Sequence, residues 1–285
     1  MKKALFLYSG LTGAHGKSRL IEKAIARLSN SFDLVSLKTS GVEELKAEAR
    51  SSCSSCDVLL VAGGDGTFHQ VINAIASESK KPVLGFINAG TMGDVSASFG
   101  LSHSFWDGVK TIEEGHFESF DICKANDACF VYMAATGAYA DVAYKASRKE
   151  KRSFGKFAYY SYSAKEAMAK KEITLEIAIN GERISYNGPF FMALNGPRVG
   201  GFYVNKIGQP DDGRFEAYLT PSAPFNGLAS YLASKRPWCF SSSSAEVFSP
   251  SEREWCLDGE PYIFKDVRLT CLQKEIMVFC REKAK

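Results

Sequence analysis

The stretch Gly63-Gly64-Asp65-Gly66-Thr67 decides the fold of this 285-residue chain. Residues 57–62 precede it as a short apolar run, which predicts a buried strand. Residues 68–75 follow it with apolar side chains at the spacing i, i+3, i+4 and i+7, which predicts one face of an amphipathic helix. The glycines are therefore expected at a strand-to-helix turn.

Such a turn is suited to bind phosphate. Glycines allow positive φ and the close approach of a ligand, and the start of the helix offers free N–H groups with a partial positive charge. Asp65 repels phosphate unless it holds a metal ion or takes a proton. The combination favours phosphoryl transfer, and the alternative is a tight turn in which Asp65 caps the helix.

Composition narrows the class of protein. The chain is 45% hydrophobic and 24% charged, and its net charge of +3 gives no reason to expect nucleic acid as a partner. The sequence has no apolar run of membrane-spanning length and no signal-peptide pattern at its start, so a cytoplasmic protein is expected. Cys53 and Cys56 form a C-x-x-C pair without the further ligands of a zinc site, and the eight cysteines are expected to be reduced.

Strands alternate with helices over residues 1–116, which predicts an α/β nucleotide-binding domain with a parallel sheet. The last of these helices is expected at Phe105–Glu114 and to end at Gly115. Ligands of such sheets bind at the carboxyl ends of the strands. Four segments of the sequence are expected at that end: Ser9–Gly16, Thr39, Gly63–Thr67 and Asn88–Asp94.

Short strand-like runs separated by turn signals dominate residues 117–285. Before the last two strands, the runs expected as strands are Phe120–Cys123, Ala128–Met133, Ile173–Ile179, Phe190–Leu194, Phe215–Leu219 and Trp255–Leu257. They predict a β-sandwich domain, interrupted by one helical stretch over residues 139–171. Val267–Leu272 and Ile276–Phe279 are expected as its last two strands, with the chain's end open to a return into the first domain.

The motifs together resemble the diacylglycerol kinase catalytic-domain superfamily, and above all its bacterial lipid kinases. The Gly-Gly-Asp-Gly-Thr turn alone is shared with NAD kinases, so the resemblance depends on several further motifs in the right order. These are Gly90-Thr91-Met92-Gly93-Asp94, Phe154–Tyr160, Asn195-Gly196-Pro197, Pro210-Asp211-Asp212-Gly213 and Leu257-Asp258-Gly259-Glu260.

The resemblance implies Mg²⁺-dependent transfer of the γ-phosphoryl group of ATP to a lipid hydroxyl, with a diacylglycerol-like acceptor. It implies that Glu260 is the general base, with Asp258 beside it, and that Asp65 takes part in catalysis. The implied nucleotide contacts are Thr39, Gly63, Gly64, Asp65, Gly66, Thr67, Gly90 and Thr91.

The resemblance also implies two kinds of Mg²⁺ site. Asp65 and Asp94 are expected to organise catalytic Mg²⁺ through waters. A structural Mg²⁺ is expected on the Asp212 side chain and the carbonyls of Gln209 and Arg214. A plain turn at residues 211–213 remains an alternative, and a hairpin turn at residues 258–260 is compatible with catalysis there.

The chain departs from the family pattern at Ser9, Gln70, Asn88 and Gly93, and each change removes a hydrogen bond or a charge near the nucleotide. The essential acids are present, which favours an active but divergent enzyme. Two alternatives remain open at this stage, namely an NAD-kinase-like phosphotransferase and a nucleotide- or lipid-binding regulator without turnover.

A lipid kinase must reach a membrane, so peripheral contact with its inner face is expected. Lys149, Lys151, Arg152 and Lys156 form a basic cluster beside aromatic residues, and Trp238 follows a second basic segment. A solvated helix face whose aromatics pack inward is the alternative for the cluster. A homodimer remains open.

Overall fold

A computed structural model describes residues 1–9, 16–101, 103–137, 172–220 and 238–282. The chain divides into two compact units. The first unit contains Met1–Phe120 together with Lys274–Lys285, and the second contains Asp121–Gln273. The sequence-based boundary lay between residues 116 and 117.

The first unit is organised around a parallel sheet with the strand order β2-β1-β3-β4. Every residue of β3 and β4 is buried, which is expected of parallel strands with both faces covered. The strands are β1 (Lys2–Ser9), β2 (Phe32–Thr39), β3 (Val58–Gly63) and β4 (Val83–Asn88).

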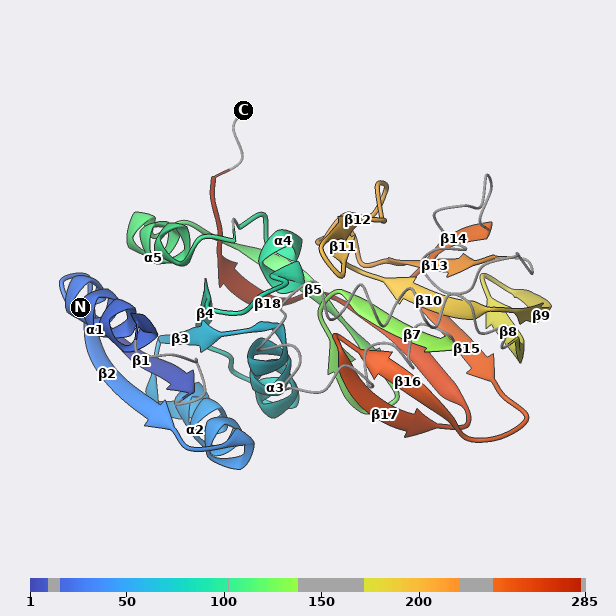
Figure 1. The fold of residues 1–285 in the computed structure, drawn as a ribbon, viewed down its shortest axis with the longest axis horizontal. Coiled ribbons are helices and arrows are strands. Elements are labelled where there is room, and N and C mark those ends of the chain that lie inside the picture. Colours follow the sequence, from blue (N-terminus) through green and yellow to red (C-terminus); the bar gives the residue numbers. More distant parts are fainter. Residues whose placement is uncertain (10–15, 102, 138–171, 221–237, 283–285) are drawn as a thin grey trace. The chain divides into compact units, whose positions relative to one another are not determined.

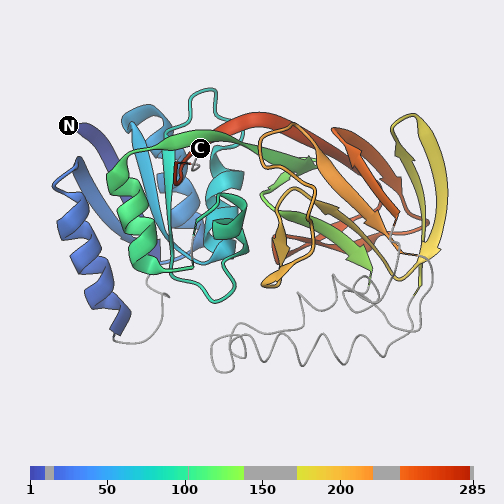
Figure 2. The ribbon, with the colours of Figure 1, turned by 90° about the horizontal axis from the view of Figure 1, so that it is seen from above.

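Helices cover both faces of this sheet: α1 and α5 lie on one side, and α2 and α3 on the other (Figures 1 and 2). The Ser104 side chain accepts a hydrogen bond at the start of α5, and Gly115, with φ 77°, ends that helix. The helices are α1 (Gly16–Leu28), α2 (Val42–Ser55), α3 (Asp65–Ile75), α4 (Asp94–Ser98) and α5 (Phe105–Glu114).

The chain's end returns to the first unit through β18 (Val267–Phe279), where Val278 pairs with Leu84 in parallel. Phe279 packs edge-on against Phe32 and Phe117, with ring centroids 6.3 and 5.8 Å apart. The sequence predicted two strands here, but the structure has one. The polar residues 273–275 suggested a break, yet they lie within the strand, with Lys274 at φ 55°.

The second unit contains an antiparallel sheet with the strand order β14-β13-β10-β7-β16-β17. In a second group of strands, β18 pairs with β15, β15 with β8 and β8 with β9, while β5 pairs with β18 and β6. These strands are β5 (Phe117–Ala125), β6 (Ala128–Phe130), β7 (Met133–Gly137), β8 (Ile173–Ile179), β9 (Glu182–Gly188), β10 (Phe190–Leu194), β13 (Phe215–Leu219), β14 (Trp238–Ser242), β15 (Ser244–Phe248), β16 (Arg253–Leu257) and β17 (Glu260–Phe264).

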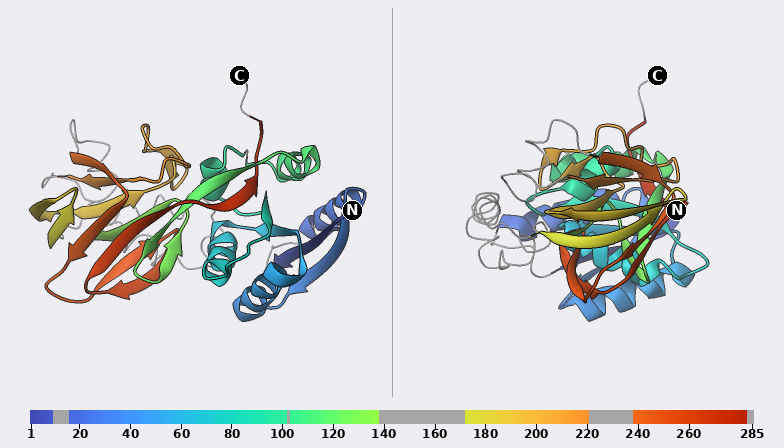
Figure 3. Two further views of the ribbon diagram at one scale, coloured as in Figure 1. Left: turned by 180° about the vertical axis from the view of Figure 1, so that it is seen from behind. Right: turned by 90° about the vertical axis from the view of Figure 1, so that its right-hand side faces the viewer.

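The core of the second unit follows from alternation along its strands. In β8, residues 173, 175, 177 and 179 are buried, and in β13 residues 215, 217 and 219 face the same core. Trp255 and Phe191 meet there edge to face, with centroids 5.9 Å apart. The antiparallel strands of this unit are seen from two further sides in Figure 3. The predicted combination of an α/β domain with a C-terminal β domain is confirmed.

The basic cluster with Lys149, Lys151, Arg152 and Lys156, and the predicted helix over residues 139–171, lie outside the described residues. Trp238 lies inside them, at the start of β14, and is 48% exposed. Within the described part of the chain, no helix has both the length and the apolar character to cross a bilayer.

Candidate active site

The glycine turn joins β3 to α3 as the sequence predicted. Gly64 is the N-cap of α3, and its carbonyl accepts from the N–H groups of Thr67 and Phe68 at 2.9 and 3.2 Å. Asp65 is the first helical residue, and no side chain caps this helix. The alternative in which Asp65 caps its own helix is therefore wrong.

The Asp65 carboxylate instead binds the start of another helix. The backbone N–H groups of residues 93–95 donate to it at N···O distances of 3.0, 3.3 and 3.1 Å. These residues begin α4, so an acid at the N-terminus of α3 also binds the positive end of α4. This contact connects the two turns that the sequence predicted to contact a nucleotide.

Asp65 and Asp94 form a pair of acids in this region. Asp94 is 1% exposed. Burial of the Asp65 carboxyl group and the negative charge of Asp94 together raise the pKa of Asp65 to about 7, although the three backbone N–H donors lower it. Because the two carboxylates repel each other, a divalent cation with a preference for oxygen ligands fits here.

The glycine turn, residues 63–67, and the second turn, residues 88–94, lie in direct backbone contact. A Cβ added to Gly90 would lie 2.6 Å from the Gly64 Cα atom, and the Ala89 N–H donates to the Gly63 carbonyl at 2.8 Å. A Cβ on Gly63 would lie 2.5 Å from the Thr67 Cβ atom. Glycine is therefore required at these two positions, because the neighbouring atoms leave no room for a Cβ atom.

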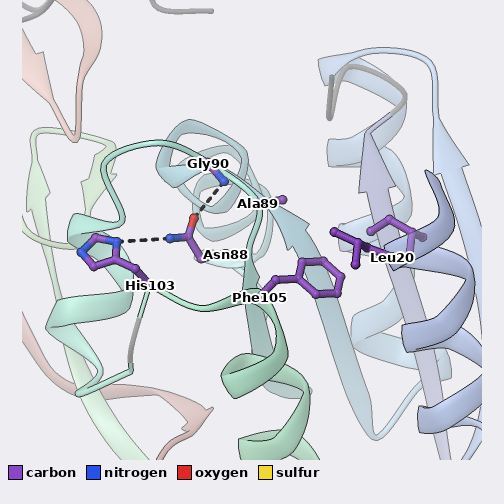
Figure 4. Close-up of a pocket in the computed structure, with 7 residues that line it drawn as sticks. Leu20, Asn88, Ala89, Gly90, His103 and Phe105 are labelled. Atoms are coloured by element: carbon purple, nitrogen blue, oxygen red, sulfur yellow. Dashed lines mark hydrogen bonds between the residues drawn. The ribbon is translucent and has the colours of Figure 1, made fainter. Parts of the chain in front are cut away.

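Two of the departures from the family pattern have a structural explanation. The Asn88 side chain accepts from the Gly90 N–H at 2.9 Å, so it orders the second turn from within (Figure 4). Gly93 has φ 67°, a left-handed conformation that glycine adopts without strain. Gln70 is half-buried on α3, and Ser9 ends β1 opposite Thr39.

A small pocket lies beside the second turn (Figure 4). Its wall combines polar groups of this turn with apolar side chains from α1 and α5. The lining residues are Leu20, Ile21, Asn88, Ala89, Gly90, His103 and Phe105. Thr39 is not among them: it is buried, and its hydroxyl donates to the Tyr8 carbonyl at 3.4 Å. Thr91 is exposed.

In the second unit, Asp258 and Gly259 form the turn between β16 and β17. Their φ angles of 51° and 88° are those of a tight hairpin turn with both central residues left-handed. Glu260 is the first residue of β17 and is half-buried. The hairpin that the sequence allowed is therefore present, and Glu260 directly follows its turn, paired with Leu257.

Asp258 is held as firmly as Asp65. Its carboxylate, 2% exposed, accepts from the backbone N–H groups of residues 131–133 at 2.7, 2.9 and 3.1 Å. Asn195 supports the same segment by donating to the Val131 carbonyl at 2.8 Å. Both carboxylate oxygens of Asp258 are occupied by backbone donors, so Asp258 positions the turn and leaves Glu260 as its candidate base.

The loop of the predicted structural Mg²⁺ site is closed by two acids. Asp212 is exposed and accepts from the Arg214 N–H at 2.9 Å, while Asp121 is buried and accepts from the Gly213 N–H at 2.6 Å. Burial raises the pKa of Glu216, and the charge of Asp212 contributes to the rise. Oxygen donors and excess negative charge fit Mg²⁺, and the turn predicted as an alternative is also present.

In the first unit, the structure thus brings together Asp65, Asp94, Gly90 and the glycines of residues 63–66. It places Asp258 and Glu260 on one hairpin of the second unit. Sequence reasoning gave no role to Asp121, Asn195 and the apolar wall of the pocket. Asn195 stood in a recognised motif, but nothing in the sequence indicated its partner, which is distant along the chain.

Comparisons with known proteins place these features in a family. Residues 3–125 match the diacylglycerol kinase catalytic domain. A diacylglycerol kinase of Staphylococcus aureus (strain bovine RF122 / ET3-1) is 30% identical over 217 residues, which are 75% of this chain and 69% of the relative. One of Staphylococcus saprophyticus is 30% identical over 225 residues, covering 78% and 74%.

Solved structures support the fold. The crystal structure of a diacylglycerol kinase from Bacillus anthracis str. Sterne aligns with a TM-score of 0.85 and 22% identity, covering 98% of this chain and 97% of that one. A further crystal structure from that organism reaches 0.88 at 22% identity, covering 99% of both chains. The chain therefore belongs to the diacylglycerol kinase family and is a lipid kinase.

Gly90→Ala tests the contact between the two turns. The new methyl group would overlap the Gly64 backbone, so we expect a loss of about 1–3 kcal/mol in the free energy of unfolding. Urea unfolding measures it. Gly41→Ala is the control for an added methyl group, because a Cβ there meets nothing within 4 Å and its loss is limited to the poorer N-cap that alanine gives α2. Equal stability of the two variants would show that the turns are not in contact.

Asp258→Asn tests the positioning role of this acid. The amide retains one acceptor oxygen for three N–H donors, so buried donors lose their partner and we expect a loss of about 1–3 kcal/mol. Thermal and urea unfolding measure it, with Asp33→Asn on the exposed surface of β2 as the control. Unchanged stability would mean that Asp258 does not hold the hairpin.

Proposed function

We propose that the protein transfers the γ-phosphoryl group of ATP, with Mg²⁺, to the hydroxyl of a diacylglycerol-like lipid. The observation that carries this proposal is the acid pair of Asp65 and Asp94 on glycine turns whose backbones touch. Phosphoryl transfer needs positioning and charge neutralisation more than covalent chemistry. Family membership favours a lipid acceptor over NAD.

The nucleotide is proposed to lie along the two turns. The N-terminus of α3 and the glycines offer N–H groups and a partial positive charge to the phosphates. The pocket beside Gly90 has apolar walls from Leu20 and Phe105, a surface suited to the flat adenine ring (Figure 4). Thr39, Thr67 and Thr91 remain proposed contacts.

Asp65 and Asp94 are the proposed holders of catalytic Mg²⁺, which would neutralise charge on the transferring phosphoryl group. Their mutual repulsion, which contributes to the raised pKa of Asp65, is relieved by a cation. The second Mg²⁺ is proposed on Asp212 and the carbonyls of Gln209 and Arg214. Its place in a closed loop suits a structural role.

Glu260 is the proposed general base, which removes the proton from the acceptor hydroxyl as the phosphoryl group arrives. Glu260 directly follows the turn of a hairpin that Asp258 fixes through three backbone N–H groups. The oxygens of Asp258 are occupied by these donors, so the proton is assigned to Glu260.

The function is tested with labelled ATP, Mg²⁺ and mixed vesicles that contain diacylglycerol, monoacylglycerol, sphingoid base, ceramide and phosphatidylglycerol, together with free NAD. Label in diacylglycerol supports the proposal. Label in another lipid keeps the lipid kinase and replaces the acceptor. Label in NADP, or no transfer despite nucleotide binding, contradicts it.

Glu260→Gln separates chemistry from binding. The amide retains the shape of the side chain but cannot take a proton, so we expect kcat to fall about 10²- to 10⁴-fold with ATP affinity nearly unchanged. Kinase assays and calorimetric ATP binding measure the two effects. The matched control is Glu254→Gln, an exposed acid on the preceding strand. Activity that survives in Glu260→Gln would exclude it as the base.

Membrane contact is proposed at a projecting hairpin, β11 (Arg198–Val199) and β12 (Phe202–Tyr203), which the sequence did not indicate. Phe202, Tyr203 and Ile207 are 40%, 68% and 62% exposed. The Arg198 guanidinium lies 5.2 Å from the centre of the Tyr203 ring. Arg198 itself is buried and supports the ring from inside the hairpin, whereas Lys206 is exposed beside Ile207. Exposed aromatic and aliphatic groups next to an exposed cation suit the surface of an anionic membrane.

Replacing Phe202 and Ile207 together by Ser should weaken binding to vesicles that contain phosphatidylglycerol by about 10-fold or more, because both side chains lose apolar contact with lipid. Vesicle sedimentation measures it. Activity on short-chain diacylglycerol dispersed as monomers should persist. Ile263→Ser, at a residue 66% exposed elsewhere, is the control and should bind as the parent protein does. An equal loss of vesicle binding in the double variant and in Ile263→Ser would refute the contact between the hairpin and the membrane.

A further inference from the structure

His116, Glu118 and Cys280 project from one face of two paired chain segments. His116 directly precedes β5, Glu118 is the second residue of that strand, and Cys280 directly follows β18. The Cys280 N–H donates to the His116 carbonyl at 3.1 Å, which fixes the pairing at this point. Since neighbouring residues alternate across a strand, Phe117 and Phe279 lie on the opposite face, where their rings meet at 5.8 Å.

The three side chains bring their donor atoms together. The His116 Nε2 atom lies 3.2 Å from a Glu118 carboxylate oxygen, and the Cys280 Sγ atom completes a group within 4.8 Å. Two tetrahedral ligands of zinc with bonds of about 2.0–2.2 Å are about 3.4 Å apart. The histidine and glutamate donors thus already have ligand spacing, and both side chains are partly exposed and able to adjust toward the sulfur.

The donor types select the metal. Thiolate and imidazole favour zinc-type cations, whereas Mg²⁺ takes oxygen ligands. We propose that His116, Glu118 and Cys280 bind a zinc-type divalent cation at a site distinct from the Mg²⁺ sites. Three protein ligands leave the fourth position to water. Among the residues that the structure describes, these three form the only group of three or more His, Cys, Asp and Glu donors with such spacing.

Binding has two physical consequences. The Cys280 thiol releases its proton to solvent. The His116 Nε2 atom gives up the proton that it donates to Glu118, to Nδ1 or to solvent, and its lone pair then binds the metal. The metal also joins residues 116–118 to residue 280, far apart in sequence. Because it binds the folded chain, it should raise the unfolding temperature.

The test starts from the full-length protein, reduced and freed of metal by a chelator. Titration with Co²⁺ should give a thiolate-to-cobalt charge-transfer absorption that saturates at one metal per chain. Zn²⁺ should displace Co²⁺ and abolish that absorption, whereas excess Mg²⁺ should leave the absorption unchanged. Absence of the cobalt band, or its loss in Mg²⁺, would overturn the proposal.

Variants then assign the ligands. Cys280→Ser should remove the cobalt band, and His116→Ala should lower zinc affinity, measured against a chromophoric chelator, by more than about 100-fold. Glu118→Gln should weaken zinc and retain the band. The controls are Cys239→Ser and the double change Cys53→Ser with Cys56→Ser, which should bind as the parent does.

Folding is checked separately, because Cys280 is 3% exposed and its replacement could disturb packing. His116 is more exposed, so His116→Ala should keep the unfolding temperature of the metal-free parent while losing the rise that zinc produces. Zinc affinity that survives in His116→Ala and Cys280→Ser, or disappears with Cys53 and Cys56, would refute the site.

Discussion

The carboxylate of Asp65, bound by the backbone N–H groups of residues 93–95, is the contact on which the first unit's site depends. It holds the glycine turn against the start of α4 and places Asp94 beside it. Burial and the neighbouring charge raise the pKa of Asp65 to about 7, so the arrangement carries an electrostatic cost that a cation offsets. The glycines follow from this contact, because any Cβ at Gly90 would separate the turns.

The second unit uses the same interaction for another purpose. Asp258 receives three backbone N–H groups from residues 131–133 and thereby fixes a hairpin whose next residue is Glu260. In both units, an aspartate whose oxygens are occupied by amides determines where a neighbouring acid lies. This division explains how one motif can contain both a structural turn and a candidate base.

The pattern of the sequence predicted much of the fold, because helical and strand periodicities are local. Helix α5 and strands β8, β10 and β13 lie where the sequence placed them. The five-residue helix α4 was missed, since its stability comes from Asp65, a residue distant in sequence. Strand β9 was missed because its exposed face is largely polar, and β18 was divided because polar residues interrupt its apolar run.

By itself, the sequence determined the order of the elements, the two kinds of sheet and the identity of the candidate acids, because these follow from local periodicity and from turn chemistry. Only the tertiary structure decided which of those acids are held by backbone amides and which are not. It also brought together residues such as His116 and Cys280, and Asn195 and Val131. Hydrogen bonds and close approaches between distant segments depend on packing in three dimensions, and residue spacing along the chain contains no direct record of them.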